Sequence, residues 1–132
     1  MKNSLNVICV LLFLIVFFDS EWGFVVSKTS TPIDVSKYTV VIIEETEQRS
    51  YIPQSQLNAI KSQVWRDYVK SQGGQWRVLD PHADISKEEK WVKDSFAVSR
   101  ESLPWLIFAS PEKGYSGPVP ENLEELLEVI TK

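Results

Sequence analysis

Hydrophobic and polar positions follow two different periods along the chain, and the changes of period predict the order of the elements. Residues 38–43 (YTVVII) form an uncharged, β-branched run that predicts a buried strand. Residues 53–72 instead carry apolar side chains at helical spacing, and Gly73-Gly74 is expected to end that helix. Residues 75–79 (QWRVL) alternate apolar and polar side chains, which predicts a second strand.

The second half of the chain predicts another helix, two strands and a C-terminal helix. Residues 86–89 (SKEE) have the pattern of a capping box, which predicts a short helix that starts at the serine. Residues 103–109 are apolar and predict a buried strand, followed by a turn at residues 110–114 and a short strand around residues 115–119. Residues 121–132 carry Leu and Ile at helical spacing and predict the last helix.

The resulting order, β-α-β-α-β-β-α, predicts an α/β fold. A strand–helix–strand unit gives a parallel pair with a right-handed crossover, whereas the tight connection between the last two strands predicts a hairpin. We therefore expect one mixed sheet with helices on both of its faces. A chain of 132 residues with 43% hydrophobic and 24% charged residues suits one globular domain.

The N-terminal segment, residues 1–27, has the pattern of a targeting sequence. Lys2 precedes an unbroken run of 12 apolar residues (VICVLLFLIVFF), shorter than the roughly 20 that a membrane span needs. Both a signal peptide cleaved after Ser27 and an uncleaved membrane anchor over residues 5–26 remain open. In either case we expect an exported protein, which is secreted or is held at a membrane only through this segment.

Composition limits the partners of the remaining chain. Residues 28–37 are polar and predict a linker to a domain over residues 38–132. The formal net charge is −4 and the basic residues form no cluster, which argues against a nucleic-acid partner. Cys9 is the only cysteine, so the chain beyond the leader can form no internal disulfide, thiol nucleophile or CxxC redox pair. No motif implies a cofactor.

Residues 102–108 (SLPWLIF) place a proline at the mouth of an apolar strand, where proline loses a ladder hydrogen bond. With the element order and with Gly117 before an amphipathic helix, this pattern resembles the thioredoxin-like superfamily over residues 38–132. The resemblance implies that Pro104 is a cis-proline opposite the active site. It also implies a CxxC pair near residues 46–52 (TEQRSYI), where this chain has no cysteine. Thiol–disulfide oxidoreductase activity is therefore excluded.

With disulfide exchange excluded, the function that the resemblance still implies is binding. A cis bond before Pro104 would turn the Leu103 backbone outward, so that an extended peptide could pair with it. The competing interpretation is that the proline only shapes the entry to the strand. No catalytic residue is assigned, and the candidate binding residues are Glu47, Gln48, Arg49, Ser50, Leu103, Pro104 and Trp105. Trp105 is included because strand alternation could turn it towards the groove.

Metal binding is the alternative chemistry. If residues 80–84 (DPHAD) were extended, Asp80, His82 and Asp84 would project on one side and could hold a divalent ion. This set predicts a metal-dependent hydrolase. A loop rich in Asp and Pro is the other explanation of the same residues.

Two further groups of side chains have a structural explanation. Trp65, Trp76 and Trp91 lie at apolar-face positions of their elements, so we expect them to pack in the core. The acidic run that includes Glu44, Glu45 and Glu47 is expected to be a solvated loop. A membrane-tethered structural domain without a ligand is a third possible function.

Overall fold

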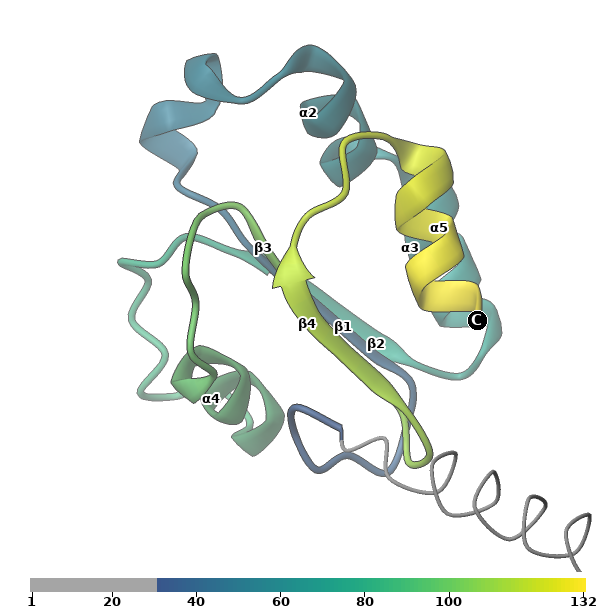
Figure 1. Ribbon diagram of the computed structural model, residues 1–132. Coiled ribbons are helices and arrows are strands. Elements are labelled where there is room, and N and C mark those ends of the chain that lie inside the picture. The colour runs from purple at the N-terminus through teal and green to yellow at the C-terminus, as the bar shows by residue number, and fades with distance from the viewer. Residues whose placement is uncertain (1–30) are drawn as a thin grey trace, which may run out of the picture.

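A four-stranded mixed sheet organises residues 31–132, the part of the chain that the computed structural model describes (Figure 1). β1 (Thr39–Ile43) and β2 (Gln75–Leu79) are parallel. β3 (Trp105–Ala109) runs antiparallel to β1, and β4 (Gly114–Pro118) runs antiparallel to β3. The strand order is β2-β1-β3-β4. The predicted α/β class and the mixed sheet are confirmed.

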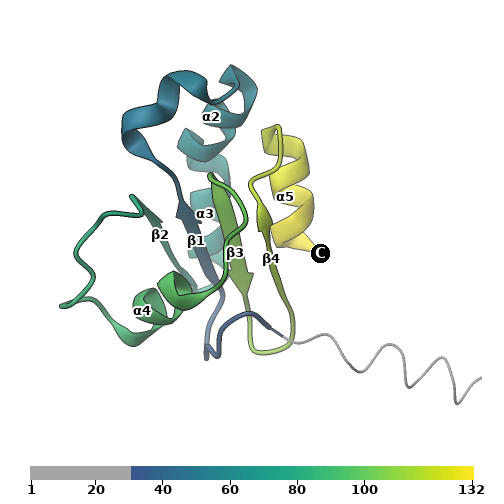
Figure 2. The same ribbon diagram turned by 60° about the vertical axis from the view of Figure 1, so that its left-hand side comes forward.

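Helices lie on both faces of this sheet. α2 (Gln54–Lys61), α3 (Gln63–Ser71) and α5 (Leu123–Thr131) cover one face, and α4 (Lys90–Ala97) covers the other (Figures 1 and 2). A short 3-10 helix, η1 (Thr46–Tyr51), connects β1 to α2. No helix within residues 31–132 is long and apolar enough to cross a membrane. The predicted signal peptide or anchor, residues 1–27, lies outside the described residues.

The central strands have buried side chains on both faces, which explains why they are uncharged and, apart from Thr39, apolar. All five residues of β1 and all five of β3 are buried. Because side chains alternate along a strand, Val40 and Ile42 enter the core under α2, α3 and α5, whereas Val41 and Ile43 enter the core under α4. Ile33 is also buried, in the core under α4. The segment predicted as a linker therefore contributes to the packed domain.

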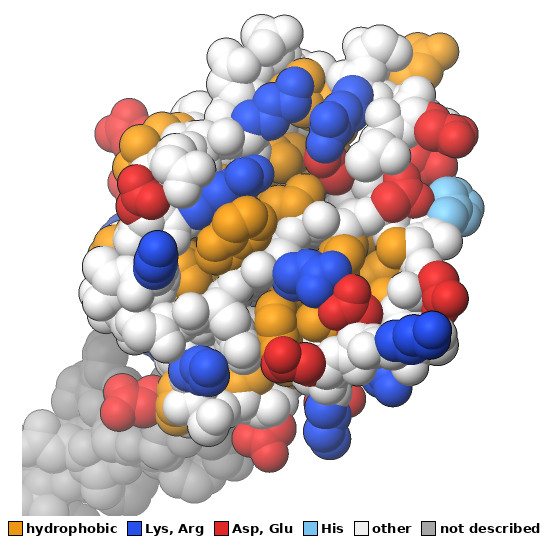
Figure 3. Space-filling view, turned by 180° about the vertical axis from the view of Figure 1, so that it is seen from behind, with side chains coloured by type: hydrophobic (Ala, Val, Ile, Leu, Met, Phe, Trp, Pro, Cys, Tyr) orange, Lys and Arg blue, Asp and Glu red, His pale blue; other side chains and the backbone are white. Residues whose placement is uncertain are grey.

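The tryptophans pack as expected. Trp65 is fully buried, and Trp76 and Trp91 are partly buried against the two cores. The guanidinium of Arg66 lies over the rings of Trp65 and Trp76, 5.2 and 4.5 Å from their centroids. Seen from behind, hydrophobic side chains reach the surface in patches between Lys and Arg (Figure 3). Basic side chains therefore border the apolar surface on this face.

The single helix predicted over residues 53–72 is wrong, because the chain breaks it at Ser62. This residue is extended (φ −64°, ψ 135°), and its hydroxyl caps α3 by accepting from the amide two residues on. The indole N–H of Trp65 donates to the carbonyls of Ala59 and Ile60, at 3.0 and 3.2 Å. These bonds satisfy carbonyls that the break leaves without helical partners.

The capping box predicted at residues 86–89 is also wrong. α4 begins at Lys90, and the Ser86 N–H donates to the Asp84 carboxylate at 3.0 Å. Glu89, the glutamate that would close the box, precedes α4 directly, and its carboxylate accepts from the Trp91 indole N–H at 2.6 Å. Its neighbour Glu88 makes two hydrogen bonds of 2.8 Å to the guanidinium of Arg77, and this bidentate pair ties the segment before α4 to β2.

Candidate functional site

The peptide bond between Leu103 and Pro104 is cis, which is the geometry that the sequence resemblance implies. Pro104 is buried, and its carbonyl accepts from the Val119 N–H at 3.1 Å, which closes the end of the β3–β4 ladder. The side chain of Leu103 remains exposed. Within residues 31–132 its backbone N–H and C=O make no hydrogen bond, so both are free to bind a ligand.

These two residues line a cavity of about 210 Å³, which we call the cis-proline pocket. Its other wall comes from η1 and the start of α2 and consists of Glu45, Gln48, Tyr51, Ile52, Pro53 and Gln56. The structure therefore brings Gln48, from one predicted segment, together with Leu103 and Pro104 from the other. These two segments are far apart in the sequence but lie side by side, because β1 and β3 are neighbours in the sheet.

Four other predicted binding residues do not line this pocket. Glu47 and Ser50 are exposed on η1, and the side chain of Arg49 binds Glu44. Trp105 is 6% exposed and packs in the core under α4, where its indole N–H donates to the Ser116 hydroxyl at 2.9 Å. Trp105 is thus a core residue and does not turn towards the pocket.

The most exposed apolar side chain at the pocket is one that the sequence analysis missed. Three large hydrophobic side chains are exposed within residues 31–132: Tyr51 at 84%, Val64 at 53% and Leu103 at 38%. Tyr51 and Leu103 both line the cis-proline pocket. An apolar residue at the end of the polar run EETEQRSY was the available signal for Tyr51. Exposed apolar side chains that converge on one pocket are typical of an interaction site.

A buried ion pair holds η1 in place beside the pocket. The Glu44 side chain is completely buried at the end of β1, and its carboxylate accepts a hydrogen bond from the guanidinium of Arg49. The Glu44 N–H also donates to the Leu79 carbonyl at 2.9 Å, so the residue is tied to β2. The expectation of a solvated acidic loop is therefore wrong for Glu44. Partnership with Arg49 makes its burial possible.

Asp80 connects the end of β2 to the first residue of η1. Its carboxylate accepts from the Thr46 hydroxyl at 2.6 Å, from the Thr46 N–H at 3.0 Å and from the His82 N–H at 2.8 Å. These bonds, with that of the Thr46 hydroxyl the largest, lower the pKa of Asp80 from 3.8 to about 2. Ionised Asp80 therefore stabilises the position of η1 through its bonds to Thr46.

We expect stability to depend on this carboxylate in acid. Because folding lowers the pKa of Asp80, its contribution is complete above about pH 4 and is lost as the pH falls from 4 towards 2. Asp80→Asn should therefore flatten the fall in the free energy of unfolding over this interval, as measured by urea titrations at pH 4, 3 and 2. Thr46→Val should raise the pKa of Asp80 and have a similar effect. Identical pH dependence in wild type and Asp80→Asn would show that the bonds to Thr46 and His82 do not favour ionised Asp80.

The three predicted metal ligands are not brought together. Asp80 binds Thr46, His82 has its Nε2 3.2 Å from the Glu45 Oε1, and Asp84 accepts from the Ser86 N–H. In the described part of the chain, no three His, Cys, Asp or Glu side chains form a group that could hold a metal ion. The geometry does not favour the metal-dependent hydrolase hypothesis.

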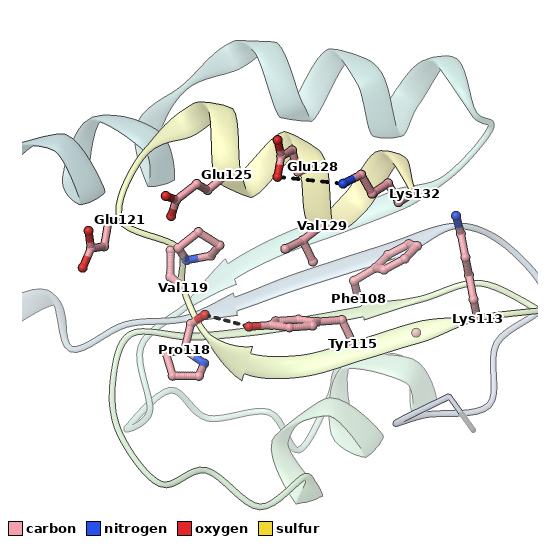
Figure 4. Close-up of a pocket in the computed structure, with 12 residues that line it drawn as sticks. Phe108, Lys113, Tyr115, Pro118, Val119, Glu121, Glu125, Glu128, Val129 and Lys132 are labelled. Carbon is pink, nitrogen blue, oxygen red and sulfur yellow. Dashed lines mark hydrogen bonds and ion pairs between the residues drawn. The ribbon is translucent and has the colours of Figure 1, made fainter. Parts of the chain in front are cut away.

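A larger groove of about 780 Å³ lies between β4 and α5 (Figure 4). Its apolar part includes Phe108, Tyr115 and Val129, and three glutamates, two of them on α5, stand at its border: Glu121, Glu125 and Glu128. The Tyr115 hydroxyl donates to the Pro118 carbonyl at 3.3 Å. This backbone acceptor beside the groove therefore already has a partner. Pro118 also lacks a backbone N–H, so the end of β4 is a poor place to add another strand.

Comparison with known proteins adds no further assignment, because no family model, curated protein or solved structure matches the chain. The cis-proline pocket is the candidate site because two exposed apolar side chains meet there with the Leu103 backbone, which makes no hydrogen bond within residues 31–132.

Proposed function

We propose that this domain is thioredoxin-like but redox-inactive, and that it binds an extended segment of a peptide or protein at the cis-proline pocket. The order of elements along the chain, the mixed sheet with helices on both faces and the cis bond before β3 support this proposal. Residues 28–132 contain no cysteine. Binding, rather than disulfide exchange, is the function that these features support.

The observation that carries the proposal is the convergence of Tyr51 and Leu103 on one pocket. Both side chains are exposed, and burying them against a partner would remove apolar surface from water. The N–H and C=O of Leu103, which make no hydrogen bond in the described part of the chain, lie at the same place. An extended chain can satisfy such groups with its own backbone while its side chains enter the pocket.

Selection of random peptides on the full chain tests this proposal. We expect peptides that bind the wild type in titrations, and we expect Tyr51→Ala to weaken them by about tenfold or more, because a large aromatic contact is lost. Leu103→Ser should weaken them as well. Val64→Ser is the matched control, since Val64 is exposed but does not line the pocket.

Two results would contradict the proposal. In one, selection yields no peptide that binds; in the other, the selected peptides bind Tyr51→Ala and Leu103→Ser as tightly as they bind the wild type. The first result would favour a structural domain without a ligand, and the second would place the binding surface elsewhere.

A further inference from the structure

We infer that the cis-proline pocket receives one basic side chain, Lys or Arg, from the extended segment that binds there. The inference rests on the proposed function and adds the chemistry of the residue that is recognised. It follows from the charge, the hydrogen-bonding groups and the size of the pocket.

The charge of the pocket is negative. Among the residues of the 31–132 range that line it, Glu45 is the one Asp, Glu, Lys or Arg, and its side chain is 26% exposed. Its Oε1 lies 3.2 Å from the His82 Nε2, and within residues 31–132 no hydrogen bond is made to its other carboxylate oxygen. The nearest basic residue in sequence, Arg49, is bound to Glu44 and does not line the pocket. An acidic ligand side chain would therefore meet a like charge.

The amide side chains of the pocket add acceptors. The Gln56 Nε2 donates to the Val119 carbonyl at 2.7 Å, which fixes this amide and leaves its oxygen without a partner among the described residues. The Gln48 side chain makes no hydrogen bond within residues 31–132, so its oxygen is also available. An apolar ligand side chain would leave these acceptors and Glu45 unpaired, which costs free energy. Lys and Arg carry several donors and no acceptor, and so match this set.

The size of the pocket fits one side chain. A volume of about 210 Å³ is below the roughly 300–1,000 Å³ of small-molecule sites. The backbone of Leu103 is positioned to pair with the main chain of the ligand, while the exposed ring of Tyr51 can cover the aliphatic stem of a Lys or Arg side chain.

The groove between β4 and α5 does not support the same inference. Glu125 lies in the first turn of α5, where a carboxylate stabilises the helix, and Glu128 is 4.0 Å from the Lys132 ammonium. These glutamates have structural roles, and Glu125→Gln therefore provides a charge-matched control for Glu45→Gln.

The test uses random peptides with acetylated and amidated ends, selected on the full chain. We expect one position to be enriched in Lys or Arg. Replacing that residue by Met, which is uncharged and of similar length, should weaken binding by roughly five- to tenfold. Glu45→Gln should remove the difference between the basic and Met peptides, whereas Glu125→Gln should preserve it. His82→Gln removes the imidazole beside Glu45 and should preserve or enlarge the difference in affinity between the basic and Met peptides.

The outcomes separate this inference from the proposed function. Two outcomes would overturn the inference and leave the proposed function intact. In the first, the selected peptides need Tyr51 for binding but show no preference for Lys or Arg. In the second, the preference for a basic residue persists in Glu45→Gln. Loss of the preference in His82→Gln would also overturn it, because Glu45 would still carry its charge. If no peptide binds, both the inference and the proposed function fail.

Discussion

Trp65→Ala should lower the free energy of unfolding by about 4 kcal/mol. The Trp65 ring is fully buried between α3 and the sheet, so the substitution leaves a large cavity. Its indole N–H also satisfies the carbonyls of Ala59 and Ile60 at the break between α2 and α3. Urea denaturation followed by circular dichroism measures the change.

Trp65→Phe separates the two contributions. It retains an aromatic ring but removes the N–H donor, so we expect a smaller loss, about 1–2 kcal/mol. A loss below about 1 kcal/mol for Trp65→Ala would contradict the assignment of this side chain to the centre of the core.

Arg49→Met should lower the free energy of unfolding by about 2 kcal/mol. The substitution leaves the Glu44 carboxylate completely buried without its partner. The loss should be smaller than the roughly 3–5 kcal/mol of a fully buried pair, because the Arg49 side chain is 40% exposed and solvent screens the pair. The double variant Glu44→Leu with Arg49→Met should recover most of this loss, since no uncompensated charge then remains.

The exposed pair between Lys90 and Asp94 supplies a matched control for this cycle. Its side chains are 2.6 Å apart, but Lys90 is 84% exposed, so Lys90→Met should change stability by less than about 0.5 kcal/mol. If Arg49→Met were equally harmless, or if the double variant were less stable than Arg49→Met, the buried pair would not be what holds η1.

The strands were predictable because burial leaves a simple pattern in them. β1 and β3 are buried on both faces, and apart from Thr39 their residues are all apolar; β2 has the predicted bounds. The break at Ser62 could not be predicted in the same way, because apolar residues keep helical spacing across it. The capping box at residues 86–89 did not form because its two end residues make other contacts: the Ser86 N–H donates to Asp84, and the Glu89 carboxylate accepts from the Trp91 indole.

The candidate site was predictable only in outline. The two segments were identified, and their meeting depends on the pairing of β1 with β3. Gln56 carries no local signal, since it enters the pocket through the packing of α2 against α5 and its bond to Val119. The burial of Glu44 depends on the path of η1, which returns Arg49 to it. The positions of Gln56 and Glu44 are determined by tertiary contacts, which a local sequence pattern does not record.

Amide hydrogen exchange of the full chain, with and without a selected peptide, tests the central claim most directly. Within residues 31–132 the Leu103 N–H has no intramolecular partner, so it should exchange rapidly in the free protein. Binding at the cis-proline pocket should slow exchange at Leu103 and in η1. Slowed exchange confined to β4 and α5, or unchanged exchange at Leu103 in a saturated complex, would contradict the account.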